Sequence, residues 1–199
     1  MNDFRAIGVT LSVALITHLL NVKVDIMHLI NCSESAHTET ILEIFNDAIA
    51  NSTALYDYRP RDLAFMTSWW EAKRKGNFPV LGLQNDDGAL MAFASYGSFR
   101  AFAAFKYSVE HSIYVKKEYR GQGLGPVLLS ALIDEARRRD VHTMIGGIDA
   151  SNAASVTLHE RLGFKPAGTI REAGFKFGRW LDLSFYQLLL DTPSEPVDG

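Results

Sequence analysis

The chain has 199 residues, of which 47% are hydrophobic and 22% charged, a composition typical of one globular domain with a sizeable core. Its net charge of -3 does not favour a nucleic-acid-binding protein, because such proteins are usually basic. Its one cysteine, Cys32, cannot form an internal disulfide, which fits a reducing, cytoplasmic location. The histidines are widely spaced, so the sequence predicts no local metal-binding motif.

The role of residues 1–26 is left open by the sequence. Residues 6–20 are mostly apolar but too short to span a bilayer comfortably, and they lack the basic start and cleavage site of a signal peptide. Three interpretations remain: an amphipathic segment that packs on the domain or on a partner subunit, an extension upstream of a true start at Met27, or a targeting segment. We expect residues 27–190 to form the domain and residues 191–199 a flexible tail.

The first half of the domain predicts one strand, two helices and two further strands. Apolar side chains recur at helical spacing between Ile41 and Ile49, after serines that can cap a helix. The sequence Asn85-Asp86-Asp87-Gly88 is a strong signal for a tight turn between two strands. The predicted elements are a strand at 28–31, a helix that begins near Ser33 or Ser35, a helix at 61–74, and strands at 78–83 and 89–99.

The second half predicts two further helices among four strands, after an aromatic and basic stretch at 99–107 without a simple period. A glycine-rich turn at 119–125 separates the first of these strands from the longer helix. The strands are predicted at 109–115, 143–148, 164–175 and 180–190, and the helices at 125–139 and 152–163. Strands and helices in this order indicate an α/β or α+β domain with a mixed sheet.

The glycine-rich turn Arg120-Gly121-Gln122-Gly123-Leu124-Gly125 opens a helix. Glycine lets backbone N–H groups approach an anion, and a helix N-terminus favours negative charge, so a pyrophosphate suits this place. The turn follows a bulky linker past mid-chain, unlike the Rossmann fingerprint, and it lacks the Gly-Lys-Ser/Thr of a Walker sequence. The alternative is a turn that serves only the packing of a helix on a strand.

This turn resembles the R/Q-x-x-G-x-G/A motif of the GNAT superfamily of N-acetyltransferases. A second segment, Asn152 to His159 followed by Gly163-Phe164, resembles that family's Asn-x-x-Ala-x-x-x-Tyr and Gly-Phe, with His159 in the place of the tyrosine. The resemblance implies a mixed, mostly antiparallel sheet of about seven strands, flanked by helices and splayed where acetyl-CoA binds. It implies no metal.

The resemblance extends to the branch of phosphinothricin and methionine sulfoximine acetyltransferases. It covers residues 27–190, and four runs agree in order and spacing. The runs are Ser52-Thr53-Ala54, Val109 to Val115, Leu158 to Phe164, and Gly174 to Asp182.

The resemblance also implies which residues bind acetyl-CoA. The backbone of the strand at 113–115 would pair with the pantetheine amides as an added strand would, and one N–H there could polarise the thioester carbonyl. Asn152 would contact the pantetheine, although it also reads as a helix N-cap. The predicted cofactor-binding residues are Ile113, Tyr114, Val115, Arg120, Gly121, Gln122, Gly123, Leu124, Gly125, Pro126, Asn152 and Ser155.

Two residues are candidates for catalysis by proton transfer. Glu110, beside apolar and aromatic neighbours, would be the general base, directly or through a water, because such surroundings raise a carboxyl pKa. The alternative is a solvated glutamate at a strand end. His159 would be the general acid for the leaving thiolate, or else a histidine satisfied in the core.

The predicted substrate site is built around Arg100, because a guanidinium can hold a carboxylate or phosphinate through two parallel hydrogen bonds. The alternative is an exposed loop arginine. The other residues expected in this pocket are Ala101, Phe102, Glu110, His111 and Ser112.

These expectations describe an N-acetyltransferase that transfers acetyl directly to the amine of a small amino-acid-like substrate. Two alternatives stay open: acetylation of protein or peptide amines, and an acetyl-CoA-binding module without activity. Neither nucleic acid nor a membrane is an expected partner. The branch suggests a homodimer, and Trp69, Trp70 and the apolar N-terminus are the surfaces that could form its contacts.

Overall fold

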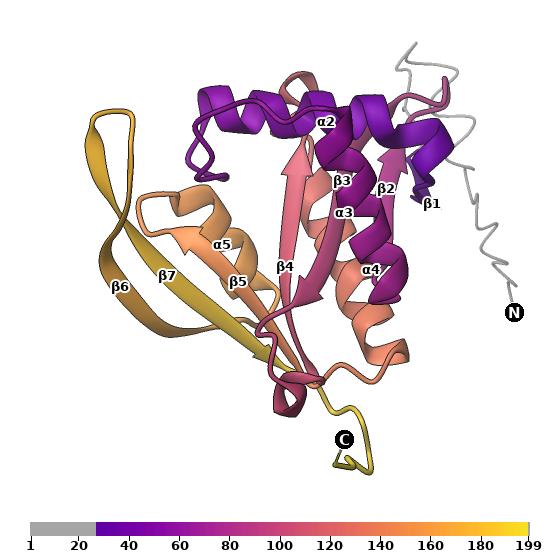
Figure 1. Cartoon of the computed structure of the whole chain (residues 1–199), viewed down its shortest axis with the longest axis vertical. Coiled ribbons are helices and arrows are strands. Elements are labelled where there is room, and N and C mark those ends of the chain that lie inside the picture. The colour runs from indigo at the N-terminus through magenta and orange to yellow at the C-terminus, as the bar shows by residue number, and fades with distance from the viewer. Residues whose placement is uncertain (1–26, 199) are drawn as a thin grey trace, which may run out of the picture.

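The computed structural model describes residues 27–198 of the chain (Figure 1). The three interpretations of residues 1–26 therefore concern a segment outside the described residues. Within the described range, two helices follow the first strand, and later helices alternate with the strands of one sheet. No helix in residues 27–198 is both long and apolar enough to cross a membrane.

Every helix and strand predicted for this range is present, with ends that shift by a few residues. The four helices are α2 (Glu34–Asn51), α3 (Leu63–Lys75), α4 (Leu124–Arg138) and α5 (Ala153–Arg161). The seven strands are β1 (His28–Asn31), β2 (Val80–Gln84), β3 (Leu90–Ser98), β4 (Ser108–Val115), β5 (Thr143–Asp149), β6 (Lys165–Lys176) and β7 (Arg179–Leu189).

The helix starts follow from their capping residues. Asp62 precedes α3, and its carboxylate accepts a hydrogen bond from the N–H of Phe65 at 2.8 Å. Ser33 precedes α2 but makes no side-chain capping bond; its own N–H donates to Nδ1 of His37 at 2.9 Å. The predicted start of α2 was therefore right, but the serine hydroxyl does not cap the helix.

The seven strands form one sheet in the order β1-β2-β3-β4-β5-β7-β6. All neighbouring strands are antiparallel except β4 and β5, which are parallel and pair only from Ser108–Glu110 to Thr143–Ile145. Beyond Glu110 the two strands diverge, as Figure 1 shows. The predicted mixed, mostly antiparallel sheet of about seven strands is confirmed, and the splay that was predicted where acetyl-CoA binds is found between β4 and β5.

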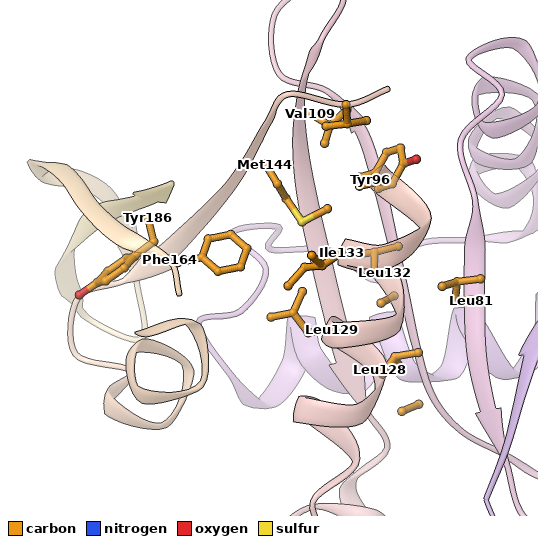
Figure 2. Packing of buried hydrophobic residues seen from close by; sticks show 14 of the residues in the cluster. Leu81, Tyr96, Val109, Leu128, Leu129, Leu132, Ile133, Met144, Phe164 and Tyr186 are labelled. Atoms are coloured by element: carbon orange, nitrogen blue, oxygen red, sulfur yellow. The ribbon is translucent and has the colours of Figure 1, made fainter. Parts of the chain in front are cut away.

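Two hydrophobic clusters cover the two faces of the sheet. On one face, α4 packs Leu128, Leu129 and Leu132 against the sheet side chains Tyr96 and Met144 (Figure 2). On the other face, α2 and α3 pack on β2, β3 and β4 through a cluster of aromatic and aliphatic side chains. Because side chains alternate along a strand, neighbouring residues of β4 and β5 face opposite layers.

The tryptophans of α3 are not a free surface for dimer contacts, contrary to expectation. Trp70 is buried, and its indole N–H donates to the hydroxyl of Thr38 at 2.8 Å. Trp69 is partly buried, and its ring lies 5.6 Å from that of Phe45. Both side chains belong to the core beneath α2 and α3, because the helix turns its apolar face to the sheet.

The C-terminal residues after β7 return to the N-terminal ends of β4 and β5. The hydroxyl of Thr192 donates to the carbonyl of Val141, and the N–H of Val197 donates to the hydroxyl of Tyr107 at 3.2 Å. These contacts do not test whether residues 191–199 are flexible, so the flexibility of this tail stays a prediction.

Candidate active site

The gap between β4 and β5 is the central feature of the candidate site. Past Glu110, β4 keeps its antiparallel partner β3 but has no partner strand from residues 27–198 on its other side. Alternate backbone groups of residues 111–115 therefore face the gap without a strand to pair with, so an extended ligand rich in amides can take that place.

A cavity of about 310 Å³ fills this gap and reaches both faces of the sheet. Side chains of Glu110 and Ser112 belong to the face covered by α2 and α3, whereas those of His111 and His159 belong to the side of α4 and α5. The cavity is lined by Thr53, Ala54, Leu55, Tyr56, Glu110, His111, Ser112, Ile113, Tyr114, Gly146, Gly147, Ile148, Asp149, Asn152, Ser155, His159 and Leu183.

Glu110 lies where the two strands separate. A Cβ on Gly147 would lie 2.9 Å from its Oε1, so the absence of a side chain on β5 makes room for the carboxylate. Burial raises the pKa of Glu110, and the Arg100 guanidinium partly offsets this rise. A half-buried carboxylate with a raised pKa beside an open cavity has the properties of a general base.

His111 and His159 form a buried hydrogen-bonded pair, with their Nε2 atoms 3.1 Å apart. Nδ1 of His159 lies 2.7 Å from the carbonyl oxygen of Ser155, which can only accept, so this nitrogen carries a hydrogen. Burial lowers the pKa of both rings, that of His111 to about 3, and both are neutral. His111 therefore donates from Nε2 to His159, and its buried Nδ1 lacks a partner among the described residues.

A second cavity, of about 540 Å³, lies at the N-terminus of α4. Gly121 and Gly123 both have φ of +79°, a left-handed conformation that favours glycine, and Cβ atoms there would meet no neighbour. The sequence analysis explained these glycines by the close approach of a ligand to the backbone. Their left-handed backbone conformation is enough to explain why glycine stands at both positions. The first-turn N–H groups of α4 have no acceptor within the helix, so the loop presents donors suited to phosphate.

The predicted residues of this loop do not all face that cavity. Arg120, Gly121, Gly123, Leu124, Gly125 and Pro126 line it together with Val115. Gln122 does not line it; its side chain donates to the carbonyl of Glu118 at 3.2 Å. Arg120 lies beside the cavity and donates to the carboxylate of Asp47 at 2.7 Å and to the carbonyl of Val115 at 3.0 Å.

Asn152 is the N-cap of α5, as the sequence predicted. Its side-chain oxygen accepts from the N–H of Ser155 at 3.1 Å. Both residues line the central cavity on the same side as His159. Their side-chain contact with a cofactor stays a prediction.

Arg100 lies close enough to act on the carboxylate of Glu110, but it does not line the cavity that Glu110, His111 and Ser112 share. Arg100 stacks on the ring of Phe99, with its Cζ 4.3 Å from the ring centroid, and donates to that residue's carbonyl. Arg100, Ala101 and Phe102 are exposed and lie outside the lining of the central cavity. Ser112 lines the cavity beside Glu110, whereas His111 belongs to the opposite layer.

Several lining residues were not among the predicted site residues. Thr53 to Tyr56, from the loop after α2, and Asp149, from the end of β5, line the central cavity. Ala153, Thr157 and Arg161 of α5 line the cavity at the glycine-rich loop. The run Ser52-Thr53-Ala54 is part of the family resemblance, and it could have indicated that the loop after α2 belongs to the site. Residues 27–198 contain no group of three or more potential metal ligands.

Comparison with known proteins decides the family. The family model described as the acetyltransferase (GNAT) family matches residues 39–164, which contain the gap, Glu110 and the glycine-rich loop. This chain is a member of the GNAT acetyltransferase family. As a GNAT protein it is an enzyme of the acyltransferase class, and the fold expected from the sequence is the one observed.

Individual relatives in the family are similar over most of their length. An L-methionine sulfoximine/L-methionine sulfone acetyltransferase of Pseudomonas paraeruginosa is 47% identical over 78% of this chain and 91% of its own. A GNAT superfamily phosphinothricin acetyltransferase from Sinorhizobium meliloti, solved in complex with acetyl-CoA, is 31% identical with a TM-score of 0.82, covering 87% of this chain and 94% of that one. A ribosomal-protein-alanine N-acetyltransferase from Brucella melitensis is 43% identical with a TM-score of 0.79, covering 82% and 99%.

Proposed function

We propose that this enzyme transfers the acetyl group of acetyl-CoA to the amine of a small amino-acid-like substrate of the methionine sulfone, methionine sulfoximine or phosphinothricin type. The observation that carries the proposal is the position of Glu110, at the mouth of a cavity that joins the two faces of the sheet. The names of similar proteins support the choice of substrate.

Glu110 is the proposed base. The substrate arrives as an ammonium ion, which must lose a proton before its nitrogen can attack a carbonyl carbon. The raised pKa of Glu110 brings its proton affinity closer to that of an amine than an exposed glutamate would have. Glu110 would accept this proton, directly or through a water molecule.

The cofactor would lie on the side of α4 and α5. Its pyrophosphate suits the glycine-rich loop with Arg120, and its pantetheine suits the unpaired edge of residues 113–115, with Asn152 and Ser155 nearby. Acetyl-CoA supplies the acetyl group as a thioester. An N–H of the unpaired edge would donate to the thioester oxygen and so stabilise the charge that develops there.

His159 is the proposed proton donor to the leaving sulfur. It lines the cavity on the cofactor side, and its neutral ring carries a hydrogen at Nδ1. To donate that hydrogen, the ring must release its bond to the carbonyl of Ser155. The amine nitrogen loses two protons in all: Glu110 takes the first before the attack, and the second, lost once the nitrogen is bonded to the carbonyl carbon, restores the His159 ring that has given its proton to the sulfur.

We also infer that residues 27–190 function as one acetyltransferase domain in the cytoplasm and that two copies form a homodimer. The hairpin of β6 and β7 offers an alternative to the buried tryptophans as a dimer contact. It exposes the large apolar side chains Ile170, Phe175, Phe177 and Trp180, which a second copy could cover. Light scattering of the intact protein measures its mass in solution, and a monomer mass would contradict the dimer.

A second candidate function is acetylation of a protein N-terminus. The observation that favours it is the 43% identity to the ribosomal-protein-alanine N-acetyltransferase of Brucella melitensis. The cavity of about 310 Å³ is closer in size to an amino acid than to a polypeptide, which needs a long groove.

One experiment separates the two functions. Free thiol released from acetyl-CoA is measured with methionine sulfone, methionine sulfoximine, phosphinothricin, ordinary amino acids, polyamines and peptides with free N-termini. Turnover of the first three supports the small-molecule function. Turnover of peptides alone contradicts it and moves the function to protein modification.

A further inference from the structure

The loop between α2 and α3 brings Tyr56 to the central cavity, on the same side as Glu110. The phenol oxygen of Tyr56 is buried and has no hydrogen-bond partner among residues 27–198. A buried hydroxyl without a partner destabilises a protein, and such groups are rare in native structures. Its persistence at a cavity suggests that a ligand supplies the missing partner.

The nearby carboxylate of Asp149 is not a hydrogen-bond partner of this hydroxyl and accepts from other groups. The buried carboxylate of Asp149 accepts from the N–H and hydroxyl of Ser151, both at 2.9 Å, and from Arg179 at 3.1 Å. Asp149 and Arg179, the two charged groups that act on this hydroxyl, form an ion pair with each other. The surroundings therefore suit a neutral acceptor better than a carboxylate.

The position of Tyr56 is fixed by the β6–β7 hairpin. The ammonium group of Lys176, whose side chain is buried, donates to the carbonyls of Ser52 and Leu55 at 2.8 and 2.6 Å. The ring of Tyr56 packs on the backbone of β6, where a Cβ on Gly174 would lie 3.4 Å from Cδ2. The loop thus presents the hydroxyl in a defined place before any substrate binds, which lowers the entropic cost of recognition.

We propose that Tyr56 is a specificity-determining residue whose hydroxyl donates a hydrogen bond to a neutral oxygen on the substrate's side chain, as a sulfone or sulfoximine carries. The inference rests on the proposed function and adds to it the group that distinguishes methionine sulfone from methionine. Burial raises the pKa of Tyr56, with Asp149 adding to the rise and Arg179 opposing it, so the phenol stays protonated and able to donate.

The test compares kcat/KM for L-methionine sulfone and for L-methionine in the wild-type protein and in Tyr56→Phe. Methionine has the same amine, carboxylate and carbon chain but lacks the sulfonyl oxygens. We expect the variant to lose about tenfold on the sulfone, the worth of one net hydrogen bond, and to keep its value on methionine. If methionine turns over too slowly, its inhibition constant against the sulfone replaces kcat/KM.

Tyr96→Phe is the matched control, because Tyr96 also has a buried hydroxyl without a partner among the described residues. Tyr96 lies in the core beneath α4 and lines neither cavity (Figure 2). We expect this variant to match the wild type on both substrates.

Two results for Tyr56→Phe would contradict the specificity role. An equal loss on both substrates would show that the hydroxyl acts on their shared parts or on the fold, and an unchanged sulfone value would show that it does not touch the substrate. Either result overturns the specificity role while leaving the proposed function intact. A wild-type protein that acetylates none of methionine sulfone, methionine sulfoximine and phosphinothricin would overturn the proposed function, and this inference with it.

Discussion

The Nε2 atoms of His111 and His159 lie 3.1 Å apart in the gap where β4 and β5 separate. Directly across the strand, Glu110 occupies the other face of the sheet at the same gap. The neutral imidazole pair therefore lies on the side of the gap toward α5, and the carboxylate lies on the side toward α2. In the mechanism that we propose, proton removal from the amine and proton delivery to the sulfur therefore take place on two sides of one cavity.

Replacing Glu110 by glutamine keeps the shape of the side chain and removes its basicity. We expect kcat to fall by about 10² to 10⁴, the usual contribution of a general base, with acetyl-CoA binding unchanged. Steady-state rates and a direct binding titration measure the two quantities. The exposed Glu39 on α2 gives the control Glu39→Gln, and an unchanged rate in Glu110→Gln would refute the base assignment.

The consecutive glycines of β5 predict two different outcomes for the same substitution. In Gly147→Ala the new Cβ would lie 2.9 Å from Oε1 of Glu110, the free end of a flexible side chain. The carboxylate can move aside, so we expect stability to change little and kcat to fall on the order of 100-fold, the cost of a displaced catalytic group.

In Gly146→Ala the Cβ would lie 2.9 Å from Nε2 of His159 and 3.1 Å from Nε2 of His111, between two packed rings. We expect a loss of about 1–3 kcal/mol in the free energy of unfolding, because buried rings cannot yield without strain. Urea unfolding measures stability and initial rates measure kcat. Equal stability losses in the two variants would contradict the different surroundings of the two glycines.

Arg100 is predicted to set the pH at which the reaction slows in acid, through the pKa of Glu110. Its positive charge stabilises the carboxylate of Glu110 and so lowers a pKa that burial has raised. A base works when deprotonated, so activity falls as pH drops through the pKa of Glu110. Removing the charge in Arg100→Gln raises that pKa, and the acid limb of kcat/KM should move to higher pH.

The same variant tests the other role considered for Arg100. If the guanidinium binds the substrate's carboxylate, KM for the amino acid rises across the whole pH range, with no shift of the acid limb. The exposed position of Arg100, outside the cavity lining, favours the shift. The pH profile of kcat/KM for methionine sulfone separates the two results.

The sequence predicted the order of the helices and strands, because apolar periodicity and turn residues act locally. It also predicted the position of the glycine-rich loop and the cap at Asn152. The position of Arg100 could not be predicted from the sequence, because the path of an aromatic loop depends on packing that has no period. The contacts of Lys176 with Ser52 and Leu55 join residues more than 100 positions apart, and no local pattern reveals them.

The buried histidine pair predicts a loss of stability in mild acid. Burial lowers the pKa of His111 from 6.5 to about 3 and also lowers that of His159, whereas both rings have ordinary values in the unfolded chain. The unfolded state therefore binds more protons below about pH 6.5. Stability falls as pH drops below that value, by up to about 1.4 kcal/mol per pH unit for His111 until its folded-state pKa is reached, and His159 adds to the fall until its own lowered pKa is reached.

The double variant His111→Phe/His159→Phe removes both titrating rings from the core. We expect its free energy of unfolding to change less than that of the wild type between about pH 7 and about pH 5. Urea unfolding at the two pH values measures the difference, and the exposed His28 supplies the control His28→Gln. The same pH dependence in the double variant and the wild type would contradict the neutral buried pair.

The most direct test of the account is the rate at which the intact protein releases thiol from acetyl-CoA in the presence of L-methionine sulfone, with the acetylated product identified by mass spectrometry. We expect one thiol for each N-acetyl methionine sulfone formed, at a rate that depends on the concentration of the amino acid. Thiol release that does not depend on the amino acid, or activity only toward peptides, would contradict it.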